Sequence, residues 1–457
     1  MRITKKILSL ALSLIFSVMV FTGCGGGQLS RQESQKLTFM HIWPEHASII
    51  NEIMVDFTIA NPEIEVEIKE SNYVDITNVI KNAYIGGTLP DVFFQWTNTM
   101  NVWVPEGIPM DISDVVAEIK HEYFGDGYMF ETGKVGDKYY GLPFRGSGFL
   151  VYYNKTIFNS NKWDVPTSLE ELESLLPKIK ATGLIPLAAH GGTSSNPTQT
   201  QILEAFNIFA SYQMGMVEDP NYFTGRLEPE AGDYTYAYTL MKQRNWIKAG
   251  YYGNSNTIEE AQQQFLAGNA AMALINNNDY ALIKNNMPEG CELGVFSFPA
   301  PEAIKDEFSY VSGGIDGFCI SSMTDKPEQA KKLLKYLASK EVQEKFAKAT
   351  QSFMYNKNVV YEGDYQSIAN ALKWINRYAT VPDFNIGAYA NRNKSLLDSI
   401  VAGAGTKTFE DAKSAQLEIR SNMLLGMQDK IMNPPNGLGW IKPVYTKKTY
   451  DDSWLTN

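Results

Sequence analysis

The stretch YYGLPFRGSGFLVYYNK, residues 139–155, contains two apolar, aromatic-rich runs separated by Arg145-Gly146-Ser147-Gly148. Each run is typical of a buried strand, whereas a charge and two glycines are unusual inside one. Two interpretations fit. The chain either leaves one sheet and enters another at this point, or a glycine-rich β-bulge interrupts a single sheet.

Length and composition favour a soluble protein of two domains. The 457 residues exceed what one hydrophobic core usually serves. Apolar residues make up 44% and charged residues 20%, which is ordinary for a globular protein. The net charge of −11 argues against a nucleic-acid partner, because no strongly basic face is present.

The amino terminus predicts export. A basic start precedes an apolar run at 7–21, which ends at Gly23-Cys24. The run is shorter than the roughly 20 residues of a membrane span, but it suits a signal peptide over 1–23. A cysteine before a glycine-rich segment resembles a bacterial lipobox. We therefore expect a lipidated Cys24 and a flexible tether over 24–36, with ordinary secretion as the alternative.

Alternating strands and helices predict an α/β layer with a parallel sheet in the first hundred residues. The expected strands are 37–40, 64–68 and 92–94, and the expected helices are 47–60 and 74–85. Further along, Ser168 followed by Glu171 is typical of a helix start. The later segments predict further strands at 271–275, 293–298 and 318–320 between helices.

Neither a cofactor nor a metal site is predicted. Cys291 and Cys319 remain after cleavage of the signal peptide, and their spacing favours two free buried thiols over a metal site, although a disulfide is conceivable. His41 and His46 would make a metal pair only with a third ligand, and none is nearby in the sequence.

Several segments, in their order and spacing, resemble the extracellular solute-binding lipoproteins of carbohydrate ABC transporters, the family 1, maltose-binding-protein-like group. The resemblance covers nearly the whole chain after the tether. It is carried by NPEIEVEI, GGTLPDVFF, KYYGLPFRGSGFLVYYNKTIF, VPTSLEELESLLPKIKATGLIPLA, FLAGNAAMALI, GGIDGFCISS and GTKTFEDAKSAQLEI.

The resemblance implies a two-lobe α/β architecture, the type II fold of periplasmic binding proteins, with mixed sheets flanked by helices and a cleft between the lobes. Lobe one would contain 37–145 with 297–349, and lobe two 146–296 with 350–457. Gly146 and Gly148 would then supply the backbone freedom of a hinge.

Sugar sites combine flat aromatic surfaces with polar side chains at the ends of strands. The candidate ligand residues are those with this character at expected strand ends, in the interrupted stretch and in the glycine-rich loop before 318. They are His41, Trp43, Glu45, Gln95, Trp96, Asn98, Arg145, Ser147, His190, Asn276, Asn277, Asp279, Gly313, Gly314 and Asp316.

Alternatives remain for several of these residues. Trp43 and Trp96 could pack within a lobe, and Arg145 could pair with a nearby carboxylate. At the position of Asp279 much of the family has a tryptophan that stacks on the sugar, so no particular sugar specificity transfers. Tyr280 or Trp374 could supply another aromatic plate.

The expected function is capture of a carbohydrate outside the cell by closure of the two lobes and its delivery to the permease subunits of an ABC importer. The protein would be a monomer held at the membrane by its lipid. An exported carbohydrate-active enzyme would need two opposed carboxylates, which 51 acidic residues could provide. A surface sensor or adhesin on the same fold is a third possibility.

Overall fold

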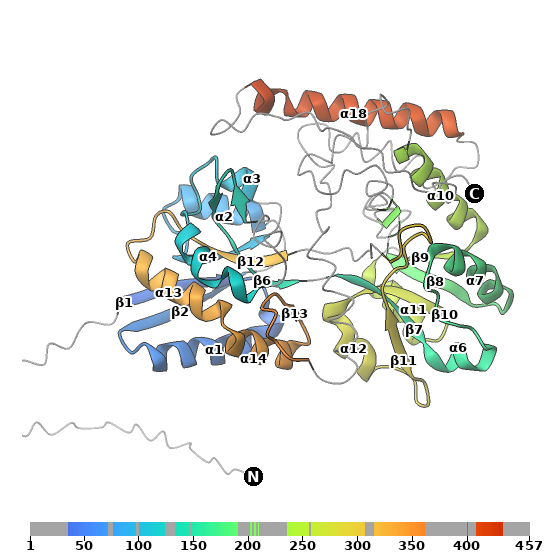
Figure 1. Cartoon of the computed structure of the whole chain (residues 1–457), viewed down its shortest axis with the longest axis horizontal. Helices are drawn as coiled ribbons and strands as arrows, with labels where there is room; N and C mark the ends of the chain where they lie inside the picture. Colours follow the sequence, from blue (N-terminus) through green and yellow to red (C-terminus); the bar gives the residue numbers. More distant parts are fainter. Residues whose placement is uncertain are drawn as a thin grey trace, which may run out of the picture.

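Two mixed sheets organise the protein in the computed structural model (Figure 1). The structure describes residues 35–71, 76–96, 100–123, 133–146, 148–190, 235–255, 257–306, 315–361 and 408–432, together with residues 202, 205, 206, 209 and 400.

Lobe one is built on a six-stranded sheet with the order β13-β6-β12-β3-β1-β2. Its strands are β1 (Gln35–His41), β2 (Ile64–Glu70), β3 (Val92–Trp96), β6 (Leu142–Gly146), β12 (Ile315–Ile320) and β13 (Phe353–Met354). β1 runs parallel to β2 and β3, whereas β12 is antiparallel to β3 and β6. The expected parallel layer is therefore confirmed, and later parts of the chain extend it with antiparallel strands.

The helices of lobe one connect and cover these strands (Figure 1). They are η1 (Pro44–His46), α1 (Ala47–Ala60), α2 (Ile76–Ile85), α3 (Met100–Trp103), α4 (Ser113–Ile119), η2 (Lys120–Glu122), α13 (Pro327–Ala338) and α14 (Lys340–Thr350). A small hairpin of β4 (Lys134–Val135) and β5 (Lys138–Tyr139) precedes β6. Asp91 accepts hydrogen bonds from Thr38 of β1 and from Thr324 after β12, and so ties three distant segments together at the start of β3.

Lobe two is built on a five-stranded sheet with the order β11-β7-β10-β8-β9. Its strands are β7 (Phe149–Asn154), β8 (Ile185–His190), β9 (Tyr252–Ser255), β10 (Ala270–Asn276) and β11 (Leu293–Phe296). Its helices are α6 (Lys155–Asn161), α7 (Leu169–Ala181), α10 (Thr235–Ala249), α11 (Ile258–Leu266), η5 (Asn277–Asp279), α12 (Tyr280–Asn285) and α18 (Phe409–Met432). α18 lies beside α10, where Gln416 accepts a hydrogen bond from the backbone of Ala237 (Figure 1).

The predicted start of α7 is confirmed by its capping contacts. Ser168 accepts a hydrogen bond from the backbone N–H of Glu171 at 3.3 Å. The Glu171 carboxylate in turn accepts from the backbone N–H of Thr167 at 2.7 Å. The first contact satisfies a backbone donor that the first helical turn leaves open, and the second holds the residue before the N-cap.

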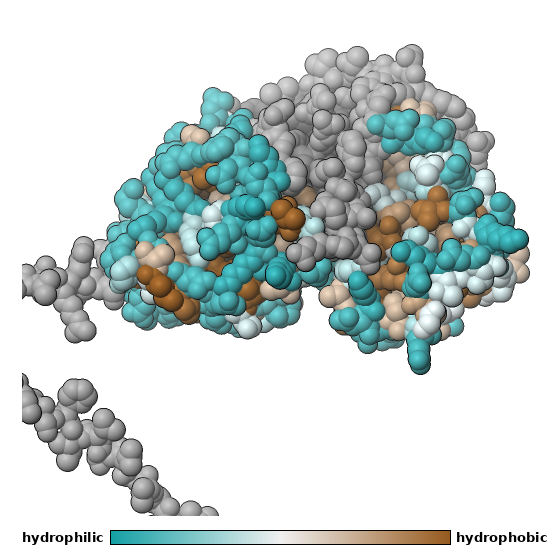
Figure 2. Space-filling view, turned by 60° about the horizontal axis from the view of Figure 1, so that its bottom comes forward, coloured by the Kyte–Doolittle hydropathy of each residue, from teal (hydrophilic) through white to brown (hydrophobic). Residues whose placement is uncertain are grey.

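The interrupted stretch joins the two sheets. β6 belongs to the first sheet and β7 to the second, and they follow each other directly in the chain. The interpretation as a bulge inside one sheet is therefore wrong. In the space-filling view the lobes form separate bodies with a notch between them on the face shown (Figure 2).

Besides Gly146, which was expected in lobe two but ends β6 in lobe one, two of the expected lobe boundaries differ from the structure. β13 pairs with β6 in the first sheet, so 353–354 belong to lobe one and not to lobe two. Phe298, Ala300 and Ile304 pack among the buried residues of lobe two, and the Ala300 carbonyl accepts from the N–H of Leu169. A two-residue strand and a short apolar segment carry no periodic signal, which explains both errors.

In this conformation a side chain at position 146 is excluded by neighbouring atoms, and the backbone angles themselves do not require a glycine. Its φ lies outside the left-handed region. A Cβ at this position would come within 2.7 Å of the Tyr355 hydroxyl and 3.1 Å of the Phe353 ring. The glycine thus lets the strand that leaves lobe one pass close against β13 and the residue after it.

We expect Gly146→Ala to lower the free energy of unfolding by about 1–3 kcal/mol, because the added methyl group meets packed aromatic atoms. Tyr355→Phe removes the nearest of these atoms, so the double variant should recover part of the loss. Denaturant unfolding of the four proteins of this cycle measures the coupling. A neutral Gly146→Ala variant would show that the close approach is absent.

Candidate functional site

The end of β1 carries the first group of predicted site residues. His41 is the last residue of β1, and Trp43 directly precedes η1. Both are fully buried. Glu45, two residues further on, has a side chain that is 52% exposed. The end of this strand therefore carries two buried nitrogen-containing rings, His41 and Trp43, and one carboxylate that is exposed to solvent, Glu45.

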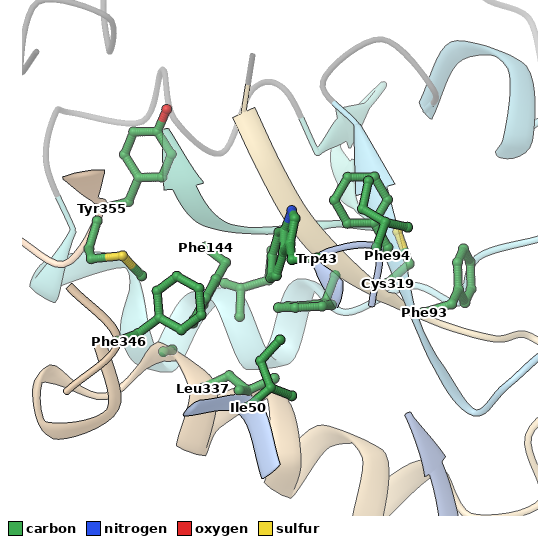
Figure 3. Close-up of a cluster of buried hydrophobic side chains, with 14 of the residues drawn as sticks. Trp43, Ile50, Phe93, Phe94, Phe144, Cys319, Leu337, Phe346 and Tyr355 are labelled. Carbon is green, nitrogen blue, oxygen red and sulfur yellow. The ribbon is translucent and has the colours of Figure 1, made fainter. Parts of the chain in front are cut away.

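Trp43 packs inside lobe one. Its ring meets Phe94 and Phe318 edge-on, each at 5.7 Å between centroids, and lies nearly parallel to Phe144 at 6.0 Å. This surrounding favours the packing interpretation of Trp43 over a sugar plate. Figure 3 shows its indole nitrogen pointing away from the apolar cluster, and in the described part of the chain Nε1 has no hydrogen-bond partner.

His41 is held as a neutral imidazole. Its Nδ1 accepts a hydrogen bond from the backbone N–H of Trp43 at 3.2 Å. Burial, and then the nearby His46, lower the pKa of His41 to about 4. At neutral pH the proton must therefore reside on Nε2, which has no partner among the described residues. Like the indole nitrogen of Trp43, it is a buried donor without an acceptor.

Arg145 and Asp316 form a buried ion pair where β6 leaves the first sheet. Arg145 Nε donates to Asp316 Oδ2 at 2.9 Å, and both side chains are almost completely buried. The guanidinium carbon lies 4.2 Å from the centre of the Trp43 ring. These contacts all lie within lobe one, so they hold Arg145 independently of lobe two. The pairing with a carboxylate is the alternative that the sequence left open.

Gln95 lies on β3 and is fully buried. Its side chain occupies the space that side chains at Gly141 and Gly317 would need. Its amide nitrogen is a further buried donor for which no described residue is a partner. Gly317 follows Asp316 on β12, so this glycine makes room for Gln95 beside the ion pair.

In lobe two, the predicted residues at the end of β10 and in η5 are held by hydrogen bonds within the lobe. Asn277 is buried and exchanges two hydrogen bonds with the backbone of Gly148, at 2.6 and 2.8 Å, which holds the chain just after it enters lobe two. The Asn276 side chain caps η5. Asp279 Oδ2 accepts from Gln262 Nε2 at 2.8 Å.

The pKa of Asp279 responds to charges in both lobes. Burial raises its pKa, and the negative charges of Glu259 and Glu45 raise it further. Glu45 belongs to lobe one and Asp279 to lobe two, so a carboxylate of one lobe contributes to the pKa of a carboxylate of the other. Gln262, which fixes Asp279, was missed, because a glutamine inside an amphipathic helix gives no signal in the sequence.

Other predicted residues lie partly or wholly outside the described residues. Trp96 ends β3 opposite Asp316, and His190 ends β8, but their side chains are outside. Tyr280 is buried beside Tyr152, which indicates a packing role. Residues wholly outside the described ranges are Cys24, Asn98, Ser147, Gly313, Gly314 and Trp374.

Metal binding finds no support in the described part of the chain. It contains no group of three or more His, Cys, Asp or Glu side chains that could hold an ion. Cys291 and Cys319 are both free thiols, as expected, but only Cys319 is buried. No helix among the described residues is long and apolar enough to span a bilayer.

We expect the free energy of unfolding to fall as the pH decreases from 6.5 towards about 4. His41 and His46 both have their pKa lowered to about 4, so in this window the unfolded chain binds protons that the folded protein does not. His41→Gln should make the fall shallower in urea unfolding. The exposed His121→Gln should leave it unchanged, and equal slopes in all three proteins would contradict the burial of a neutral His41.

Comparison with known proteins identifies related chains. Residues 43–344, well over half of the chain, match the family model described as bacterial extracellular solute-binding protein. The chain is 25% identical over 358 residues to the multiple sugar-binding protein of Streptococcus mutans, covering 75% of this chain and 80% of that one.

Two further comparisons agree with this match. The chain is 24% identical over 368 residues to an ABC transporter extracellular-binding protein of Pyrococcus horikoshii, with 75% and 78% of the two chains covered. Its fold is similar to that of apo RafE from Streptococcus pneumoniae, with a TM-score of 0.65 and 19% identity, over 85% of this chain and 98% of that one.

Proposed function

The chain belongs to the family of bacterial extracellular solute-binding proteins, and on this premise we propose that it captures a carbohydrate and delivers it to an ABC importer. The similarity to a multiple sugar-binding protein supports a carbohydrate as the solute. The similarity to an ABC transporter extracellular-binding protein supports delivery of the solute to membrane permeases.

The single observation that carries this proposal is that β6 and β7 lead the chain directly from one sheet into the other, with Glu45 in lobe one and Asp279 in lobe two as polar side chains that follow strands. A solute that lies between them receives polar contacts from both lobes. Carboxylates accept hydrogen bonds from hydroxyl groups, which every sugar offers in several directions. A site assembled from two lobes therefore suits a small polyhydroxylated molecule.

Binding of this kind favours a closed arrangement of the lobes. A ligand shifts an equilibrium between open and closed states only as far as its affinities for the two states differ. Contacts on one lobe alone would be equal in both states, whereas contacts to Glu45 and Asp279 together exist only when the lobes approach. The crossing between Gly146 and Phe149 would be part of the hinge.

The buried groups of lobe one fit this role. The Arg145–Asp316 ion pair and the Trp43 ring are fixed by contacts within lobe one. They would support from beneath the surface on which the solute first lands, while lobe two adds Asp279 and its partner Gln262 on closure. Rigid groups lose little entropy on binding, which favours affinity.

We also propose that the protein is held at the cell surface as a lipid-anchored monomer. The apolar run at 7–21 and Cys24 support cleavage of a signal peptide and lipidation of the cysteine. The first described strand begins at Gln35, so only ten residues separate Cys24 from the folded lobe. A segment of this length would keep lobe one close to the membrane.

A carbohydrate panel tests the proposed function. A true ligand at a hundredfold excess over its Kd should stabilise the folded protein by about 2.7 kcal/mol, which a thermal shift of the soluble form detects. Small-angle X-ray scattering should then show a smaller radius of gyration with that ligand. Binding without compaction would contradict closure of the lobes, and turnover of the sugars would favour a carbohydrate-active enzyme.

Cys24→Ser tests the anchor. We expect the variant to lose its lipid and to leave the membrane fraction, because the described part of the chain offers no spanning helix. Fractionation and mass spectrometry of the mature amino terminus measure both effects. A variant that stays fully with the membrane would show that another anchor exists.

A further inference from the structure

Three exposed apolar side chains lie at one end of lobe one. Ile59 and Ile85 are each 74% exposed, and Met323 is 50% exposed. The two isoleucines are the most exposed large hydrophobic residues in the described part of the chain. Single apolar side chains scattered over a surface need no explanation, but a group of them at one place marks contact with a membrane or another protein.

Ile59 lies at the end of the sheet where the parallel strands begin. It is in the last turn of α1, five residues before Ile64, and Ile64 pairs with Gln35 at the start of β1. Val55 is also exposed and lies one turn earlier on the same side of α1. The apolar stripe of this helix therefore runs out to the start of β1.

Ile85 and Met323 lie at the same end. Ile85 is the last residue of α2, and a Cβ at Gly87, two residues on, would lie 3.9 Å from the methyl carbon of Met323. The hydrogen bond from Thr324 to Asp91, at 2.6 Å, holds the segment of Met323 at the start of β3. Because β3 is parallel to β1, both residues share the end of lobe one at which β1 begins.

The turns that carry these residues contain no charged side chain. They read IANP, IGGTLP and SSMT at 59–62, 85–90 and 321–324. Lysines adjoin them, and each is paired with a carboxylate: Lys36 with Glu67, Lys326 with Asp325 and Lys332 with Glu63. A contact made by this end would therefore depend on its apolar side chains, and salt would weaken it little.

The tether decides what lies opposite this end. β1 begins on the side of lobe one that is turned away from lobe two (Figure 1), and Figure 2 shows hydrophobic residues towards that side. Ten residues separate Cys24 from Gln35. A segment of ten residues reaches at most about 35 Å. With Cys24 in the bilayer, the lipid surface is always within reach of Ile59, Ile85 and Met323, at a high effective concentration.

We propose that this end of lobe one is a membrane-contact face, on which Ile59, Ile85 and Met323 enter the head-group region of the phospholipid bilayer. The inference takes the proposed anchor as its premise and goes beyond capture of a solute. β1 then runs outward from the bilayer, and its seven residues place His41 about 20 Å further from the lipid. The candidate site thus lies at the opposite end of the strand from the membrane.

Fluorescence on vesicles tests this face without relying on lipidation. The mature chain from Gly25 carries an amino-terminal hexahistidine tag and is held on vesicles of phosphatidylcholine, phosphatidylglycerol and a nickel-chelating lipid. An environment-sensitive fluorophore is attached through Thr88→Cys, at an exposed position, in a Cys291→Ser background. Cys319 stays unlabelled, because it is buried and burial raises the pKa of its thiol. The emission should shift to shorter wavelength, and phospholipids with a spin label near the head group should quench it.

Substitution of the three apolar side chains gives the decisive comparison. Ile59→Ser, Ile85→Ser and Met323→Ser together should abolish the shift and the quenching, because the remaining turns have no apolar side chain to insert. Without the tag, this triple variant should bind the same vesicles roughly tenfold more weakly than the parent. Both proteins should bind the same sugars equally well, so a failure of the proposed capture of a carbohydrate does not affect this test.

A control variant loses three exposed apolar side chains elsewhere. Leu282→Ser, Val360→Ser and Leu417→Ser together should keep the shift and the quenching. No quenching in the parent, or equal quenching in the parent and the first triple variant, would overturn the membrane-contact face. A dimer in analytical ultracentrifugation that only the first triple variant loses would assign this end to a second copy of the chain and overturn the bilayer as its partner.

Discussion

A buried ion pair holds the point at which the chain leaves lobe one. Arg145, the residue before the last of β6, pairs with Asp316 of β12, and its guanidinium group lies over the Trp43 ring. Removing one partner of such a pair leaves an uncompensated buried charge, which costs about 3–5 kcal/mol. The Arg145 guanidinium group, the Asp316 carboxylate and the Trp43 ring therefore act together. They fix the pairing of β6 with β12, the direction in which the chain leaves lobe one, and the layer beneath the candidate site.

Local patterns predicted most of the fold. The apolar runs on both sides of Arg145 indicated two strands, and the Ser168–Glu171 spacing indicated the start of α7. The reason for Gly146 lay beyond this kind of analysis, because the atoms that exclude a side chain there belong to Tyr355, more than two hundred residues away. A contact over such a distance leaves no periodic trace in the sequence.

The sequence predicted which types of residue occur at the candidate site, but not which of them face the solute and which support the others. Trp43 and Arg145 were both identified, yet only their burial shows that they form the supporting layer. Gln262 was missed, because its importance derives entirely from its hydrogen bond to Asp279. Aromatic and charged residues at strand ends attract attention in a sequence, whereas a neutral amide on a helix does not.

The strand order of the first sheet has a consequence for how the protein is assembled. β12 lies between β6 and β3, near the middle of the sheet, although it is made more than 160 residues after β6. As the chain emerges amino terminus first, β1, β2 and β3 leave an open edge until β12 follows, after all five strands of lobe two. Lobe two has all its strands within 149–296 and can form its sheet earlier. The sheet of lobe two can therefore be complete before that of lobe one, whose open strand edge is open to aggregation in the meantime.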